Sequence, residues 1–206
     1  MAIFNFVKPD KIVLQKANDF EAQFEFRPLE PGYGVTIGNA LRRVLLNSLE
    51  GYAIIGINLA GADHEFATVK GITEDVTEII LNLKQVRFKA KVEHDVNTEK
   101  VTLSIKNKTE FTAGMIGEAS PAFEVMNPDL LICTLDSSAK LDIEITIGKG
   151  RGYVPAEEHK EKSSHFGYIP VDAIYTPIKN VKYLIENTRV EQRTDFEKLV
   201  IDVVTD

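Results

Sequence analysis

Apolar and polar residues alternate strictly in several short segments of this chain, and a period of two is compatible with a β-strand and with little else. In FEAQFEFR (20–27) the apolar residues share one face: Phe20, Ala22, Phe24 and Phe26. The same alternation recurs in three further segments, VRFKAKVE (86–93), VTLSIK (101–106) and LDIEITIG (141–148). We therefore expect half-buried strands throughout the chain. HDVNTEK, which lies between VRFKAKVE and VTLSIK, is expected to form a hairpin turn.

The strands become longer toward the end of the sequence. VKYLIENTRV (181–190) and KLVIDVVTD (198–206), separated by a polar turn, predict an antiparallel pair. If this pair joins the sheet that contains FEAQFEFR, both chain ends build one domain and the middle of the chain forms a second domain inserted in it. We predict an α+β fold of two domains, a discontinuous one of residues 1–50 plus 176–206 and a mostly antiparallel, β-rich one of residues 51–175.

Two segments have helical rather than strand periodicity. In TEDVTEIILNLK (73–84), Glu74 and Asp75 in the first turn suit the helix dipole. Its apolar residues recur at helical spacing: Val76, Ile79, Ile80 and Leu83. A second helix is predicted over residues 37–50, after the turn residues of PLEPGYG, with Thr36 as its N-cap and Gly51 as its C-terminal stop.

The helix predicted over residues 37–50 has one leucine that does not share the face of the others. Its apolar arc, the expected core face, consists of Ile37, Leu41, Val44, Leu45 and Leu49. Leu46 projects from roughly the opposite side, beside Arg42 and Arg43. An isolated exposed leucine is common on protein surfaces. The alternative is a protein contact, because arginine next to an apolar anchor is typical of interfaces.

Charge and composition limit the class of protein. The 31 acidic residues outnumber the 24 basic ones, giving a net charge of −7, which disfavours generic binding of nucleic acid. A single cysteine, Cys133, excludes a disulfide framework within the chain. The first residues lack the apolar stretch of a signal peptide, and no segment approaches the ~18 apolar residues of a membrane span. We expect a soluble, cytoplasmic protein without a membrane partner.

Motifs for catalysis or for cofactor binding are weak. His64, His94, His159 and His165 are scattered without metal-ligand spacing, and EEHKEKSSH is typical of a solvated loop. GKGRGYVPA (148–156) looks like a phosphate-binding loop, but the helix that such a loop requires does not follow Pro155. We predict no catalytic residue, no metal, no cofactor and no small-molecule substrate. A small cytoplasmic enzyme whose site assembles only in space is the alternative.

A family resemblance adds to these inferences. LEPGYGVTIGNALRRVLLNSLEGYA resembles the signature of the bacterial DNA-directed RNA polymerase alpha subunit, in its N-terminal assembly region. Further motifs of that family follow in the family's order: EDVTEIILNLK, GRGYVPA and RVEQRTDFEKLVI. The resemblance thus spans nearly the whole chain, and the motifs are highly specific when taken together.

The resemblance implies an assembly scaffold for transcription. It implies a homodimer, formed by the domain of the two chain ends, that docks the beta and beta-prime subunits, while catalysis belongs to the nucleotidyltransferase complex. In the family, Arg43 with Leu46 beside it would face the beta subunit, and we include the adjacent Arg42 in this surface. Three further partner-binding residues are carried over from family contacts to the large subunits: Glu78, Lys84 and Val171.

In that family the chain continues past the position of Asp206. A further helix completes the dimer interface, and a linker then leads to a small domain that binds DNA. We therefore expect this region alone to dimerise more weakly than a longer chain and to have no direct contact with DNA. A nucleic-acid binder is a third hypothesis, which the acidic balance disfavours.

Overall fold

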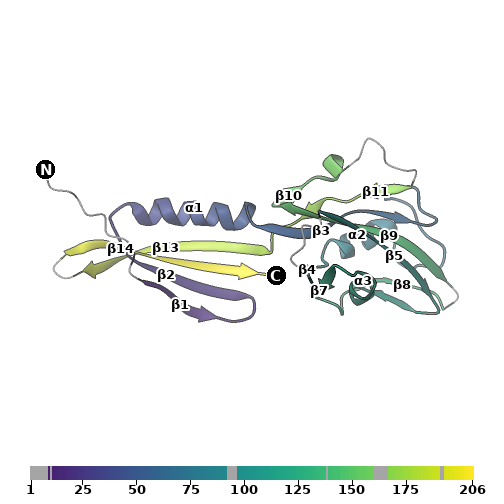
Figure 1. Cartoon of the computed structure of the whole chain (residues 1–206), viewed down its shortest axis with the longest axis horizontal. Coiled ribbons are helices and arrows are strands. Elements are labelled where there is room, and N and C mark those ends of the chain that lie inside the picture. Colours follow the sequence, from purple (N-terminus) through teal and green to yellow (C-terminus); the bar gives the residue numbers. More distant parts are fainter. Residues whose placement is uncertain (1–8, 10, 92–96, 138, 160–166, 191–192) are drawn as a thin grey trace. The chain divides into compact units, whose positions relative to one another are not determined.

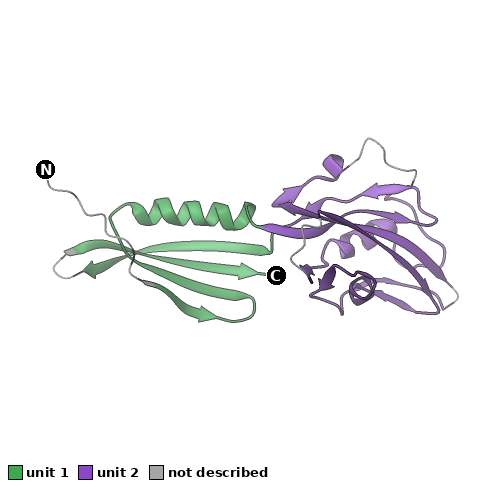
Figure 2. Ribbon diagram, viewed as in Figure 1, with its two compact units in different colours: residues 1–49, 176–206 green, residues 50–175 purple. Residues whose placement is uncertain are grey.

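The computed structural model describes residue 9 and residues 11–91, 97–137, 139–159, 167–190 and 193–206. The chain divides into two compact units (Figure 2), unit 1 of Met1–Leu49 with Thr176–Asp206 and unit 2 of Glu50–Tyr175. The boundaries predicted from the sequence lie within one residue of this division. Helices occur together with antiparallel sheets, so the predicted α+β class is confirmed.

Unit 1 is a four-stranded antiparallel sheet with a helix on one face (Figure 1). Its elements are β1 (Lys11–Ala17), β2 (Glu21–Leu29), α1 (Tyr33–Asn47), β13 (Ile178–Val190) and β14 (Arg193–Thr205). The strand order is β1-β2-β14-β13, so the predicted pair of C-terminal strands does join the strand formed by FEAQFEFR. The first and last segments of the chain therefore share one sheet.

The core of unit 1 lies between α1 and the sheet. Residues that pair across the strands point to the same face, and the pairs Ile201–Phe24 and Leu199–Phe26 place two phenylalanines of β2 on the face covered by α1. Leu199 and Ile201 are fully buried there. Phe20, which was expected on the buried face, is exposed because it precedes β2 at the hairpin turn.

Unit 2 is built around a second antiparallel sheet of four strands, in the order β11-β3-β9-β5, with three two-stranded pairs, β10-β12, β4-β7 and β6-β8. Its first elements are β3 (Glu50–Leu59), α2 (Val76–Leu83), β4 (Phe88–Ala90), β5 (Thr98–Lys106), β6 (Glu110–Thr112) and α3 (Ala113–Ala119). The others are β7 (Phe123–Val125), β8 (Leu131–Thr134), β9 (Lys140–Arg151), β10 (Tyr153–Val154), the 3-10 helix η1 (Ala156–His159), β11 (Tyr168–Pro170) and β12 (Ala173–Ile174).

The alternating segments supply the core of unit 2 as predicted. β9 buries the apolar residues of LDIEITIG, namely Leu141, Ile143, Ile145 and Ile147. Helix α2 buries Val76, Ile79 and Leu83 against the same cluster, which confirms the helix predicted over residues 73–84. Asp75 caps α2 by accepting a hydrogen bond from the backbone N–H of Glu78 at 2.7 Å.

The predicted hairpin across HDVNTEK is wrong. β4 pairs with β7, and β5 pairs with β9. The long strand β9 offers β5 nine consecutive partners, among them the matched apolar pair Val101–Ile145, so a distant strand replaces the local hairpin. Val92 and His94 lie outside the described residues.

Both predicted ends of the helix expected over residues 37–50 are also wrong. α1 begins at Tyr33 after Gly32, so Thr36 lies inside the helix, where its hydroxyl donates to the Gly32 carbonyl at 3.3 Å. The helix ends at Asn47, and Gly51 lies in β3. A Cβ atom at Gly51 would stand 1.9 Å from the carbonyl oxygen of Tyr175, so glycine is needed there for close backbone contact rather than for a helix stop.

Candidate partner-binding surfaces

Helix α1 is seated on its sheet by two glycines and capped by a distant carboxylate. A Cβ atom at Gly38 would lie 2.7 Å from Tyr183 Cδ2, and one at Gly34 would lie 2.7 Å from Glu197 Oε2. The carboxylate of Glu197 accepts hydrogen bonds from the N–H groups of Gly32 at 2.8 Å and Gly34 at 2.7 Å. A negative group at a helix N-terminus satisfies free N–H groups and complements the dipole. These contacts fix which side of α1 faces solvent.

The glycine contacts rotate α1 relative to the face predicted from its large apolar residues. Leu46 was expected on the solvent side, but it is half-buried and packs against the core of unit 1. Val44 was expected in the core, but its side chain is 48% exposed. Leu49 lies beyond the helix end and is half-buried. Only Ile37, Leu41 and Leu45 of the predicted arc pack in this core.

The exposed side of α1 carries two adjacent cations. Arg42 and Arg43 are both exposed, and neither forms an ion pair with the part of the chain that the structure describes. Val44, rather than Leu46 as predicted, is the exposed apolar residue beside Arg43. An unpaired arginine next to an apolar side chain is able to bind a carboxylate on another molecule without first breaking an internal contact.

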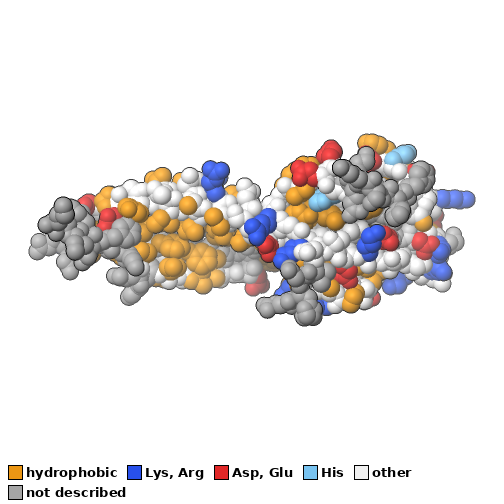
Figure 3. Space-filling view, turned by 45° about the horizontal axis from the view of Figure 1, so that its top comes forward, with side chains coloured by type: hydrophobic (Ala, Val, Ile, Leu, Met, Phe, Trp, Pro, Cys, Tyr) orange, Lys and Arg blue, Asp and Glu red, His pale blue; other side chains and the backbone are white. Residues whose placement is uncertain are grey.

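The sheet of unit 1 continues its apolar face beyond the helix. Leu14 pairs with Phe24 and Ile12 pairs with Phe26, so the side chains of β1 lie on the face that α1 covers. Ile12 and Leu14 are nevertheless exposed, because α1 packs on β13 and β14. Apolar side chains gather in this way on the side of unit 1 seen in Figure 3. An uncovered apolar sheet face is typical of a protein contact.

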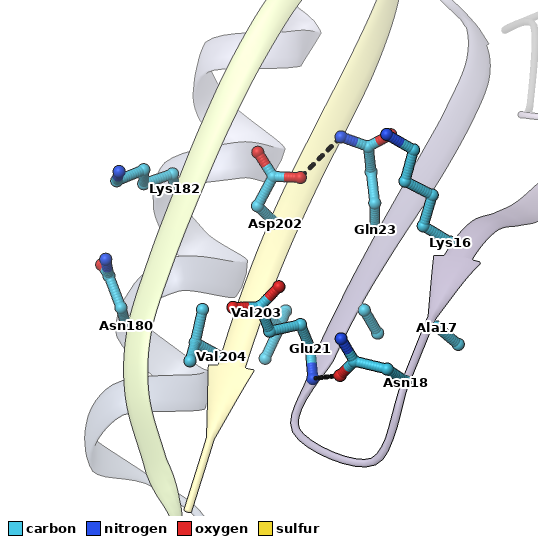
Figure 4. Close-up of a pocket in the computed structure, with 11 residues that line it drawn as sticks. Lys16, Ala17, Asn18, Glu21, Gln23, Asn180, Lys182, Asp202, Val203 and Val204 are labelled. Atoms are coloured by element: carbon cyan, nitrogen blue, oxygen red, sulfur yellow. Dashed lines mark hydrogen bonds between the residues drawn. The ribbon is translucent and has the colours of Figure 1, made fainter.

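The opposite face of the same sheet is polar and slightly hollowed (Figure 4). A groove of about 410 Å³ is lined by side chains that include Lys16, Lys182, Glu21 and Asp202, and Asp202 accepts a hydrogen bond from Gln23 at 2.6 Å. The lining contains no serine, cysteine or histidine that would act as a nucleophile or base in the common triads. The groove is a shallow polar part of the solvent-facing surface of the sheet.

In unit 2 the structure joins two segments that the resemblance had singled out separately. Lys84 Nζ lies 2.6 Å from Asp172 Oδ2. Burial alone would raise the pKa of Asp172, but the hydrogen bond and charge of Lys84, with a further bond from the Tyr153 hydroxyl, hold that pKa below its usual value. Asp172 is therefore ionised at neutral pH, and the ion pair ties α2 to the segment before β12.

The three residues predicted for partner binding in unit 2 differ in accessibility. Glu78 lies on the solvent side of α2 and is exposed, and Lys84 is half-buried in its ion pair. Val171 is only 1% exposed and belongs to the core, so its side chain cannot reach a partner in this conformation. The branched apolar side chain packs inside, while its neighbour Asp172 remains accessible.

Two further titratable groups of unit 2, Cys133 and His159, have shifted pKa values. Burial, helped by the charge of Glu74, raises the pKa of Cys133 to about 12, so the thiol stays protonated and unreactive at neutral pH. His159, at the end of η1, lies edge-on to Tyr175 with ring centroids 6.4 Å apart. Burial lowers the pKa of His159 against the charges of Glu158 and Asp172. Within the described ranges, no three His, Cys, Asp or Glu side chains are placed to hold a metal ion.

Comparisons with known proteins bear on the whole chain. A family model described as "RNA polymerase Rpb3/RpoA insert domain" matches residues 55–176. The DNA-directed RNA polymerase subunit alpha of Cytophaga hutchinsonii is 62% identical over 206 residues, which is 100% of this chain and 62% of that protein. The corresponding subunits of Flavobacterium psychrophilum and Bacteroides fragilis are each 59% identical over the same lengths.

The chain belongs to the RNA polymerase alpha-subunit family. The resemblance inferred from the sequence motifs is thereby confirmed. The chain spans 62% of the length of these curated relatives. Of the helices in the described residues, none has both the length and the apolar character needed to span a membrane.

Sequence inspection missed several residues that shape these surfaces. Gly34 and Gly38, four residues apart in GYGVTIG, were the available signal for a close helix contact. Glu197 and Asp172 act on elements 163 and 88 residues away, and no local pattern in the sequence marks such partners. Tyr153 stands in the glycine-rich GRGYVPA, which had been considered only as a phosphate-binding loop and as a family motif.

Proposed function

We propose that this chain is a non-catalytic assembly scaffold of RNA polymerase. Two copies associate through unit 1, and the pair docks the beta and beta-prime subunits, which carry out DNA-templated RNA synthesis in the cytoplasm. The observation that carries the proposal is the 59–62% identity to alpha subunits along all 206 residues of the chain. The exposed faces described above supply the physical means for both kinds of contact.

The dimer contact is assigned to the apolar face of unit 1 beside α1. Ile12 and Leu14 leave this face uncovered in a single chain, and burying it against a second copy would remove apolar surface from water. Stable homodimers commonly bury 2,000 Å² or more. The relatives are longer than this chain, so we expect a longer chain to bury more area and dimerise more tightly. Sedimentation of both lengths over a concentration series measures this difference.

The docking contact on α1 is assigned to Arg43, with Arg42 and the partly accessible Leu46 at its margin. Exposed arginines without an ion-pair partner among the described residues favour a carboxylate-bearing surface on the beta subunit. The net charge of −7 makes the nucleic-acid alternative unfavourable, so we propose that this region contacts the large subunits rather than DNA.

The test is co-purification of a tagged chain with the beta subunit of the same organism. We expect Arg43→Ala to fold normally, since surface substitutions usually change stability by under ~0.5 kcal/mol. Capture of the beta subunit should fall at least tenfold, because interface hot spots contribute on the order of 2 kcal/mol or more. Lys182→Ala, an exposed cation on the polar face of the same unit, is the matched control and should capture beta normally. Equal capture by both variants would remove Arg43 from the proposed interface.

A further inference from the structure

The 3-10 helix η1 of unit 2 has a ring contact at its last residue. η1 packs against β3 and β11, but none of its four residues is fully buried. The hydrogen bond from the Glu158 N–H to the carbonyl of Pro155, at 3.1 Å, closes the turn of η1 and does not tie it to another element. The contact between the rings of His159 and Tyr175 does tie η1 to the body of unit 2.

Tyr175 is the fixed half of this contact. Its side chain is 5% exposed, and its backbone N–H donates to the carbonyl of Gly152 at 2.8 Å. A Cβ atom at Gly150 would lie 2.4 Å from Tyr175 Cε2, so the ring lies directly on the backbone of β9. Moving this ring would leave a void in the packing, which is costly. We therefore expect η1 to be the half that detaches.

The geometry of His159 suits a neutral imidazole. Its ring meets that of Tyr175 at an interplanar angle of 72°, with the centroids 6.4 Å apart, which is within the range of favourable aromatic pairs. The Nε2 atom is buried and has no hydrogen-bond partner among the described residues. A neutral imidazole carries a proton on only one nitrogen, whereas an imidazolium carries one on both. Protonation of His159 therefore leaves a charged donor buried without an acceptor.

The charges that act on His159 only partly offset this cost. Glu158 of η1 and Asp172, in the segment before β12, both favour the protonated form. Glu158 is exposed to water, and the carboxylate of Asp172 already forms its ion pair with Lys84. Burial outweighs both carboxylates and holds the pKa of His159 below its usual value of about 6.5.

The elements packed against η1 carry other titratable groups. β3 contains Glu50 and Tyr52, and β11 contains Tyr168. Glu50 is held by an ion pair with Lys149 at 3.0 Å, and the two tyrosines are phenols. None of these groups supplies a free carboxylate that would compensate a charge on His159.

We propose that the contact between His159 and Tyr175 is an acid-sensitive switch, in which η1 stays on unit 2 while His159 is neutral and detaches when its imidazole is protonated. Because the pKa of His159 is lowered in the folded chain, the contact stabilises fully above the unfolded value of about 6.5. This stabilisation is lost as pH falls from there through the folded value. The switch is a property of a single chain, so it goes beyond the proposed function and does not depend on it.

The experiment is cleavage of the chain by a glutamate-specific protease at pH 7.5 and pH 5.5, with mass spectrometry of the cuts after Glu157 and Glu158. Each rate is divided by the rate for a synthetic peptide of residues 150–166, which corrects for the pH dependence of the protease. Opening linked to one proton increases at most tenfold per pH unit below the unfolded pKa, so the corrected rate should rise severalfold and by no more than about tenfold. Cutting after Glu144, in the central strand β9, should not accelerate, because the release is local.

Two variants assign the acid sensitivity to one residue. His159→Phe keeps an aromatic ring for the contact with Tyr175 but cannot be protonated, so its corrected rate should be low and equal at both pH values. His64→Phe is the matched control, because His64 is an exposed histidine of the same unit, and this variant should keep the acid-induced rise. Equal corrected rates for the unaltered chain at both pH values would overturn the proposal. A His159→Phe chain as acid-sensitive as the unaltered one would also overturn it.

A titration of the unaltered chain by nuclear magnetic resonance does not depend on the folding of any variant. The ring protons of His159 and Tyr175 should shift together, with one midpoint below pH 6.5. A His159 midpoint at or above pH 6.5 would contradict the proposal. Ring signals of Tyr175 that stay constant while His159 titrates would show that protonation leaves the contact intact, and the switch would be wrong.

Discussion

The cap of α1 by Glu197 gives a prediction that can be worked from individual bonds. Replacing Glu197 by alanine removes the acceptor of two N–H groups, those of Gly32 and Gly34. Water can replace it at the exposed Gly32, but Gly34 is buried, and an unsatisfied buried donor costs about 1–3 kcal/mol. With the lost charge at the helix N-terminus, worth about 0.3–1 kcal/mol, we expect Glu197→Ala to lower the free energy of unfolding by about 2 kcal/mol.

Glu197→Gln removes the negative charge but keeps the size and shape of the side chain. The amide keeps one acceptor oxygen, but its NH2 group replaces the other and cannot accept from a backbone N–H, so we expect about half the loss, near 1 kcal/mol. Denaturant unfolding followed by circular dichroism measures both variants. Glu186→Gln is the control, because Glu186 forms a surface ion pair with Lys198 at 2.5 Å and such pairs contribute about 0–1 kcal/mol. If both Glu197 variants stayed within about 0.3 kcal/mol of the unaltered chain, the carboxylate would not be the cap.

Two further variants test other contacts by the same unfolding measurement. Gly38→Ala forces a Cβ to within 2.7 Å of Tyr183. The overpacking, about 1–3 kcal/mol, should outweigh the ~1 kcal/mol gain in helix propensity and destabilise the chain. Asn39→Ala, on the exposed side of the same helix, is the control and should not destabilise. Asp172 has a lowered pKa in the folded chain, so its pair with Lys84 stabilises above the unfolded pKa of about 3.9 and is lost as pH falls through the folded value. The stability difference between the unaltered chain and Asp172→Asn should therefore shrink below about pH 4, and a constant difference from pH 7 to pH 3 would refute the ion pair.

Periodicity correctly predicted the elements in which the spacing of apolar residues in the local sequence determines which side is buried. β9 alternates over its whole length and α2 repeats at helical spacing with an acid at its cap, so both were predicted with their buried faces. The pairing of β13 with β14 was equally visible, because a short polar turn joins two long apolar strands. In these elements local propensity and the final environment agree.

The errors arose where a distant residue determines the local structure. The orientation of α1 follows from glycine contacts to the sheet. A pattern of large apolar residues does not include glycines, so Val44 was wrongly predicted to be buried and Leu46 to be exposed. The partner of β5 is decided by the longer strand β9 rather than by the nearest segment. Val171 was carried over as a contact residue on family grounds, and its burial follows from packing that no local pattern reports.

The most direct test of the scaffold is the composition of the assembly that the chain forms. The tagged chain is co-expressed with the beta and beta-prime subunits of its own organism, and the purified material is analysed by size exclusion with light scattering. We expect one complex whose mass corresponds to two copies of the chain with both large subunits. A chain that elutes alone as a monomer, with neither large subunit retained, would contradict the proposed function.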